Sequence, residues 1–369
     1  MRIALLSYST KPRGGVVHTL ALAEALVAFG VDVTVWTLGR GGDTSFFRAV
    51  EPAVDLQVVP FPDGPPHETV GERILRSIAV LRAAFDPDRY EIVHAQDCIS
   101  ANAAGRCVRT VHHIDHFTTP ELAACHERAI TEPYAHICVS TAVAEELAQG
   151  WGITAEVIPN GVAYERFATT DPAARARWQA LLGRYVLTVG GIEPRKGSID
   201  LLDAYALLRR TMPDVRLVIA GGETLFDYRD YRARWESHAT ELEVEPVVLG
   251  AVPDADLPAL VAAAAAFAFP SAKEGFGLAA MEALAAGVPL VARDLPVLRD
   301  VFGDAARLTT DATSLAAGLA AALTTHDPQR QAAGRQLAAR HTWAEAARRH
   351  LAFYREVSGR RFGTHGVER

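Results

Sequence analysis

Glu274 and Glu282 bracket a turn, Gly275 to Leu278, that we expect to open a helix. The first amides of a helix have no intrahelical partner and carry partial positive charge, so they can bind an anion. Glycine at 275 and 277 allows a phosphate to approach the backbone closely. The two carboxylates cannot bind phosphate, but they accept hydrogen bonds from hydroxyls, Glu282 from a ribose and Glu274 from a sugar. Main-chain amides that can bind phosphate, next to carboxylates that can bind sugar hydroxyls, indicate a nucleotide-sugar site.

A second cluster, Arg195 and Lys196, follows the glycine pair Gly190-Gly191. Arg195 offers a planar fork and Lys196 a point charge, and both suit a diphosphate. A nucleoside diphosphate that leaves a sugar gains negative charge, which fixed donors can stabilise without a metal. The alternative is a solvated basic pair at a helix start. The helix dipole opposes that arrangement unless an anion is present, so the sequence favours phosphate binding.

A third glycine pair, Gly14-Gly15, lies between the first apolar run and the first amphipathic stretch. This is a usual position for phosphate contact, yet the loop matches neither the dinucleotide-binding nor the P-loop pattern. A tight turn that needs two glycines is an equal alternative.

Four histidines and two aspartates gather over a short stretch, at His94, His112, His113, His116, Asp97 and Asp115. No H-E-x-x-H or C-x-x-C pattern accompanies them, so we expect no metal site. A polar wall, where a neutral imidazole bonds a sugar hydroxyl, is the favoured interpretation. A core or loop histidine is the alternative for any one of them, and it is preferred for His116.

Short apolar runs alternate with amphipathic stretches along the chain, a pattern typical of parallel α/β architecture. We expect the strands and helices of that architecture to position the residues above. Strands are expected at 2–8, 32–38, 56–60, 91–95, 109–112, 136–140, 156–158, 185–189, 216–220, 247–249, 266–269 and 289–292. Helices are expected at 18–29, 72–85, 120–130, 141–150, 171–182, 198–210, 227–241, 254–264 and 278–286, with an almost wholly helical end from 313 to 356.

The 369 residues are enough for two domains. We place them at 1–165, for the acceptor, and 166–342, for the donor, with a last helix at about 343–369 returning to the first. In open parallel sheets, ligands bind beyond the carboxyl ends of the strands.

Residues 1–170 hold 13 basic and 20 acidic side chains, so the whole net charge of −7 lies there. This argues against nucleic acid, and it favours a small molecule or glycan over an anionic lipid as acceptor. No signal segment or apolar stretch of spanning length is visible, and the four cysteines have no pattern, which suggests a cytoplasmic protein.

Taken together, the motifs resemble the retaining nucleotide-sugar glycosyltransferases of family 4, over nearly the whole chain. These have the GT-B fold, two Rossmann-like parallel-sheet domains facing a cleft. The resemblance is carried by the Glu274/Glu282 pair, Gly14-Gly15, Val157 to Val162, Arg195-Lys196-Gly197, Gly221-Gly222, Leu249 to Val252 and Trp343 to Tyr354.

The resemblance implies site roles. The catalytic candidates are His112, Arg195, Lys196 and Glu274, and the donor-binding candidates are Gly15, Val252, Gly275, Phe276, Gly277, Leu278 and Glu282. It also implies transfer from a nucleoside-diphosphate sugar with retention, without metal or other cofactor, the acceptor attacking on the face that the diphosphate leaves. This chain has Gly191 where many members have Arg, and Arg195 is the candidate to supply that charge.

Three other classes compete with transfer to an acceptor. A GT-B nucleotide-sugar epimerase would release free nucleotide without an acceptor. A two-lobed binding protein would carry a signal peptide, which is not visible. A nicotinamide dehydrogenase would need the glycine fingerprint that this chain lacks.

Overall fold

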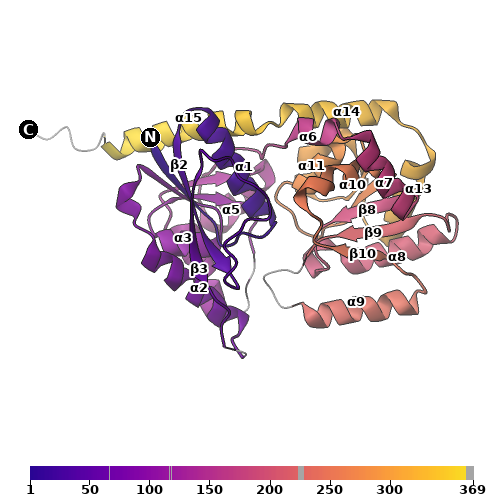
Figure 1. Cartoon of the computed structure of the whole chain (residues 1–369), viewed down its shortest axis with the longest axis horizontal. Helices are drawn as coiled ribbons and strands as arrows, with labels where there is room; N and C mark the ends of the chain where they lie inside the picture. The colour runs from indigo at the N-terminus through magenta and orange to yellow at the C-terminus, as the bar shows by residue number, and fades with distance from the viewer. Residues whose placement is uncertain (66, 116, 118, 223–227, 363–369) are drawn as a thin grey trace, which may run out of the picture. The chain divides into compact units, whose positions relative to one another are not determined.

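The chain is described by a computed structural model over residues 1–369, with 66, 116, 118, 223–227 and 363–369 left out, as well as the side chains of 360–362. It divides into two compact units (Figure 1). Unit 1 comprises Met1–Gly161 with Trp343–Arg369, and unit 2 comprises Val162–Thr342. Each unit is built on its own parallel sheet.

Unit 1 has a seven-stranded parallel sheet in the order β3-β2-β1-β4-β5-β6-β7. Its strands are β1 Arg2–Leu6, β2 Asp32–Arg40, β3 Asp55–Phe61, β4 Ile92–Ala95, β5 Val108–Val111, β6 Ala135–Cys138 and β7 Glu156–Val157. Its helices are α1 Gly14–Ala28, α2 Val70–Ala84, the short η1 Pro87–Arg89, α3 Cys98–Ala104, α4 Pro120–Thr131, α5 Thr141–Trp151 and α15 Trp343–Phe362.

The last helix, α15, belongs to the core of unit 1. Ala347, Leu351 and Tyr354 are buried in one cluster with side chains of β1 and α1, including Ile3 and Leu20. Strands such as β1 are buried along almost their whole length, because helices cover both faces of a parallel sheet.

Unit 2 has a six-stranded parallel sheet in the order β10-β9-β8-β11-β12-β13. Its strands are β8 Tyr185–Val189, β9 Arg216–Ala220, β10 Val247–Gly250, β11 Ala266–Phe269, β12 Leu290–Arg293 and β13 Ala306–Thr309. Its helices are α6 Tyr164–Ala168, α7 Pro172–Leu182, η2 Pro194–Lys196, α8 Ser198–Arg209, α9 Arg229–Glu241, η3 Asp254–Asp256, α10 Leu257–Ala263, α11 Leu278–Ala285, α12 Pro296–Phe302, η4 Gly303–Ala305, α13 Ala312–Thr324 and α14 Pro328–Arg340.

The sequence missed β13, α3, α12 and the five-residue α6, and it extended β1 to Tyr8 although the strand ends at Leu6. β13 is a short edge strand in which Arg307 breaks the apolar run, so its pattern does not stand out. The helices α3 and α12 have seven residues each, too few for a clear helical period.

The helices begin in two different ways. The first turns of α2, α3 and α13 are closed by capping boxes, such as Thr69 with Glu72. In contrast, α8 and α11 begin at Gly197 and Gly277, in the left-handed region and without a side-chain cap. The first amides of α8 and α11 are therefore not used by a capping side chain. Within the described residues, no helix combines the length and apolar character needed to cross a bilayer.

Candidate functional site

Most of the predicted donor residues lie on two loops that leave neighbouring strands of unit 2. β8 and β11 pair in parallel, with Ala266 opposite Val186, so their carboxyl ends lie at the same sheet edge. The first loop carries Arg195 and Lys196 and leads into α8. The second carries Glu274 and leads into α11. Val252 is partly buried just after β10, which is separated from β8 by β9.

The two loops are joined by ion pairs. Oε1 of Glu274 accepts hydrogen bonds from Nζ of Lys196 at 2.5 Å and from Nη1 of Arg195 at 3.2 Å. Nη2 of Arg195 also pairs with Glu193 at 3.2 Å. Burial disfavours the charged form of Glu274, but Lys196 and Arg195 outweigh it and hold the pKa of this carboxyl at about 2. Glu274 is therefore ionised at neutral pH and oriented by both predicted diphosphate ligands.

Backbone contacts lock the same two loops together. The amide of Ala272 donates to the carbonyl of Arg195 at 2.8 Å. Arg293, at the end of β12, donates from Nε to the carbonyl of Pro270 at 2.8 Å and pairs with Asp200 in α8. Gly197 has φ +65°, and a Cβ there would lie 2.2 Å from the Pro270 carbonyl oxygen, so only glycine fits this crossing. Sequence reasoning missed Arg293, because nothing in its neighbourhood distinguishes it from a surface arginine.

The start of α11 also demands glycine. Gly277 has φ +96°, and a Cβ there would meet Phe302 at 2.9 Å and Phe269 at 3.2 Å. Gly275 and Phe276 are buried just before it, while Leu278 opens the helix and is partly buried. The first amides of α11 are therefore left without a side-chain cap, and they follow the loop whose Glu274 pairs with Arg195 and Lys196.

Glu282 lies in α11, partly buried, in a different environment from Glu274. Burial raises the pKa of Glu282 to about 7, Arg166 opposes this rise, and Asp254 adds to it. Arg166 is itself paired with Asp254 at 2.8 Å, so its charge is shared. A carboxyl of this kind changes protonation near neutral pH and can accept or donate hydrogen bonds to hydroxyls.

In unit 1, the structure brings two predicted residues together, Gly15 and His112. A Cβ on Gly15 would lie 3.8 Å from Cδ2 and Nε2 of His112. Nε2 of His112 also lies 3.3 Å from Oε1 of Gln96, to which it donates. Burial, and then electrostatic interaction with neighbouring groups including His18 and Arg109, lower the pKa of His112 well below its usual value. His112 is therefore a neutral, partly buried imidazole.

The histidine group otherwise differs from the predicted polar wall. His94 is fully buried and bonded to the Tyr354 hydroxyl at 2.6 Å and the Thr110 hydroxyl at 2.7 Å, so it is a core histidine. His113 lies 3.3 Å from Asp115, and His116 lies outside the described residues. Among the described residues, no group of three or more His, Cys, Asp and Glu side chains is placed to hold a metal ion.

Behind His112 lies a histidine that sequence reasoning did not single out. His18 is fully buried, with its ring centroid 4.8 Å from that of His112, and Nδ1 donates to Asn160 at 2.8 Å. Its ring also contacts Trp343 of α15 at 5.4 Å. The edge-on contact with His18 therefore holds the orientation of the His112 ring. Only contacts between segments distant in the sequence could have revealed it.

Comparison with known proteins agrees with this architecture. Residues 12–166 match the model described as Glycosyltransferase Family 4, and residues 177–349 match Glycosyl transferases group 1. The chain is 30% identical over 382 residues to a phosphatidyl-myo-inositol mannosyltransferase of Mycobacterium leprae, covering 97% of each protein. It is 32% identical to the protein of the same name from Mycobacterium tuberculosis strain H37Rv, over 70% of this chain and 69% of that protein.

Solved structures share the fold. HepE of Anabaena, in complex with UDP and glucose, superposes with a TM-score of 0.75 at 22% identity, covering 96% of this chain and 99% of that one. Sucrose-phosphate synthase of Thermosynechococcus elongatus has a TM-score of 0.78 at 20% identity, covering 96% and 98%. The predicted GT-B fold is thereby confirmed.

Proposed function

This chain belongs to glycosyltransferase family 4 and is a glycosyltransferase, and from that premise we propose that it moves a hexosyl group from a nucleoside-diphosphate sugar to an acceptor hydroxyl. The observation that carries the donor class is the junction in unit 2, where Arg195 and Lys196 lie beside the uncapped start of α11 and share Glu274. An epimerase or a non-catalytic binding protein is not favoured by the relatives.

The donor is held through groups with separate tasks. The amides of Gly275 to Leu278 and the cations at 195 and 196 bind the diphosphate. Glu274 accepts hydroxyls of the transferred sugar, and Glu282 accepts those of the ribose. Val252 contacts the base, and Gly15 approaches the phosphate. Because several relatives are named mannosyltransferases, mannose is the first sugar to test.

We propose transfer with retention and without a metal. The acceptor hydroxyl attacks the anomeric carbon on the face from which the diphosphate departs, and a phosphate oxygen takes the hydroxyl proton. Lys196 and Arg195 supply the positive charge that a metal would otherwise bring to the departing diphosphate. The neutral imidazole of His112 serves as a hydrogen-bond partner for a hydroxyl of the sugar.

The proposal is tested by thermal stabilisation with UDP, GDP and ADP, and with their mannose and glucose derivatives. The cognate donor at 100 times its dissociation constant is expected to add about 2.7 kcal/mol to the free energy of unfolding. NMR of the product anomer in the presence of EDTA then tests retention and metal independence. The donor assignment is wrong if none of these nucleotides shifts the transition. Inverted product, or activity lost with EDTA, would refute the mechanism alone.

Two observations bear on the acceptor. The acidic charge of residues 1–170 favours a small molecule or glycan, whereas the names of several relatives specify phosphatidyl-myo-inositol, a lipid. Charge summed over a whole domain does not describe the local surface where an acceptor binds.

A further inference from the structure

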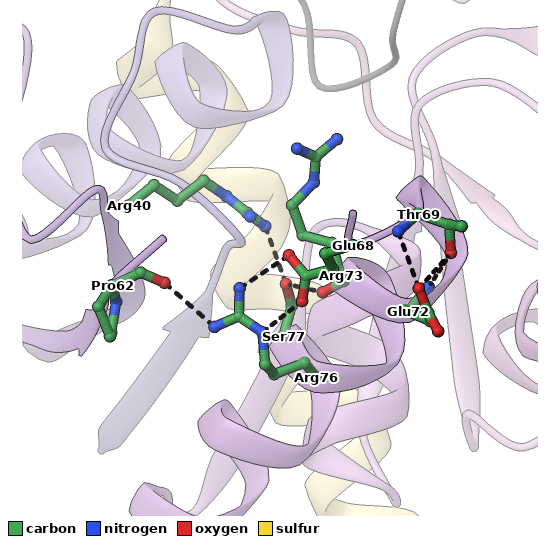
Figure 2. Close-up of polar contacts among 8 residues, drawn as sticks. All are labelled: Arg40, Pro62, Glu68, Thr69, Glu72, Arg73, Arg76 and Ser77. Carbon is green, nitrogen blue, oxygen red and sulfur yellow. Dashed lines mark hydrogen bonds and ion pairs between the residues drawn. The ribbon is translucent and has the colours of Figure 1, made fainter. Parts of the chain in front are cut away.

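Unit 1 contains a group of arginines at the carboxyl end of β2. Arg40 is the last residue of that strand, and Arg73 and Arg76 come from the first two turns of α2 (Figure 2). Figure 2 shows the guanidinium of Arg76 turned toward Glu68 and that of Arg40 turned toward Ser77. This group lies within residues 1–170, whose net charge is negative.

The Glu68 carboxylate neutralises Arg76. Nε of Arg76 donates to Oε1 of Glu68 at 2.6 Å, and Nη2 donates to Oε2 at 3.0 Å. Nη1 donates to the carbonyl of Pro62 at 3.1 Å, and the guanidinium lies 4.0 Å from the ring centroid of Phe61. The hydrogen bonds to Arg76 lower the pKa of Glu68, so this bidentate pair is charged on both sides.

Arg40 is held differently, by neutral groups alone. Its Nε donates to the carbonyl of Tyr8 at 3.2 Å and its Nη2 to the hydroxyl of Ser77 at 3.2 Å. The guanidinium also lies over the rings of Tyr8 and Phe61, at 5.5 and 5.0 Å. In the part of the chain that the structure describes, no carboxylate lies within ion-pair distance of Arg40, and Nη1 has no hydrogen-bond partner.

The surroundings make this charge costly for the apoprotein. Burial, and then the nearby Arg73, lower the pKa of Arg40, while Tyr8 and Asp97 act in the opposite direction. An arginine remains protonated in proteins, so the cost is carried as an unpaired, partly buried charge. An anion at Nη1 would offset that cost, and the two neutral bonds already fix the plane of the fork.

The sheet order places Arg40 in line with the candidate catalytic histidine. Arg40 ends β2, Tyr8 follows β1, Gln96 follows β4 and His112 follows β5, and these four strands are consecutive neighbours. At about 4.8 Å per strand, β2 and β5 are about 14 Å apart. Nε of Arg40 donates to the carbonyl of Tyr8, which follows β1, and β1 is two strand spacings, about 10 Å, from β5.

We propose that Arg40 binds a phosphate group on the acceptor, at the same sheet edge of unit 1 as His112. The inference rests on the proposed transfer function and names the acceptor's chemistry, a phosphorylated polyol or sugar. A phosphate presents oxygens in several directions, so one of them can accept from Nη1 of Arg40, whose fork is already oriented by the Tyr8 carbonyl and the Ser77 hydroxyl. The phosphate could belong to a soluble monoester or to a lipid headgroup.

The test is binding of inorganic phosphate with the donor site saturated by the nucleoside diphosphate that stabilises the protein most. Wild type is expected to bind phosphate, read by thermal shift and by 31P NMR. Arg40→Met is expected to weaken this binding about tenfold or more, because a charge-assisted fork is lost. Arg40→Lys, which keeps the charge but loses the fork, should fall between them.

The matched control is Arg48→Met. Arg48 also lies in unit 1 but is paired bidentately with Glu24, at 2.6 and 2.8 Å, so its removal should leave phosphate binding unchanged. Nucleoside-diphosphate binding reports folding in every variant. If wild type fails to bind the nucleotide, the proposed function fails; if Arg40→Met binds phosphate like wild type, or Arg48→Met loses it equally, only this inference fails.

Displacement of the bound phosphate identifies the source. myo-Inositol 1-phosphate represents a soluble acceptor, and phosphatidylinositol in phosphatidylcholine vesicles represents the same headgroup on a lipid, with plain phosphatidylcholine vesicles as blank. Displacement by either phosphorylated probe supports the inference and assigns the source. Equal displacement by uncharged myo-inositol would overturn it.

Discussion

Cationic side chains at the carboxyl edges of the two sheets have different kinds of partner. In unit 2, Lys196 and Arg195 are paired with the carboxylate of Glu274 on the adjacent loop. In unit 1, Arg40 is held by a carbonyl, a hydroxyl and two rings. A cation paired with an acid is well oriented, but its charge is already shared. A cation held by neutral groups keeps its full charge, and its desolvation is not offset by an opposite charge.

The difference suggests two tasks. A donor site must release a nucleoside diphosphate after each turnover, and an internal carboxylate that competes for Lys196 would weaken the hold on that product. An acceptor site that recognises one anionic group has no such need. Three substitutions test this comparison, and they are ordered by the expected size of the effect.

Lys196→Met should have the largest effect. Negative charge grows on the diphosphate as the sugar leaves, so loss of this ammonium is expected to lower kcat about 100- to 1000-fold, with a smaller change in KM. The control is Lys11→Met, because Lys11 pairs with Asp43 on the exposed surface of unit 1. Steady-state kinetics with the cognate donor measure both. Equal kcat values for Lys196→Met and wild type would remove Lys196 from the reaction.

Glu282→Gln should change stability in a pH-dependent way. The folded-state pKa of about 7 lies above the ordinary value of 4.5, so the contribution of Glu282 to stability is lost as pH rises through this window. The glutamine variant cannot ionise and is expected to gain about 2 kcal/mol over wild type between pH 5 and pH 8. Urea unfolding at the two pH values measures this gain. A constant difference across that range would show that Glu282 titrates normally.

Glu274→Gln should have the smallest and most telling effect. The amide cannot neutralise Lys196 or Arg195, so the free nucleoside diphosphate is expected to bind tighter by up to about fivefold, the value of one modest ion pair. Transfer should fall at the same time, because the variant accepts sugar hydroxyls less strongly. Calorimetry with the nucleoside diphosphate alone separates the two effects. Weaker binding of that product would contradict the idea that Glu274 competes for the cations.

Much of the fold was predictable from the sequence, because a buried parallel strand between amphipathic stretches is a local pattern. β11, for example, lies at Ala266–Phe269 as predicted. The start of α11 was equally predictable, since a glycine at 277 favours both a turn and a backbone conformation with positive φ, which is the one observed. β13 was not readable, because a four-residue edge strand with a central arginine resembles a loop.

Site assembly was predicted only in part. Glu274, Arg195 and Lys196 were singled out by type and neighbourhood, but their mutual ion pairs join residues 78 and 79 positions apart. His94 was assigned to a polar wall, although its bond to Tyr354 spans 260 positions and buries it. Arg40, Arg293 and His18 gave no local signal at all.

The residue types and short spacings therefore determined the class of protein, the two α/β units and the loops that could grip a phosphate. Tertiary structure alone decided which charges are neutralised and which are left for a ligand. The physical reason is range. Helix, strand and turn preferences act over a few neighbours, whereas the partner of a guanidinium or imidazole is set by which strands lie side by side, and that alignment is a property of the whole packed sheet.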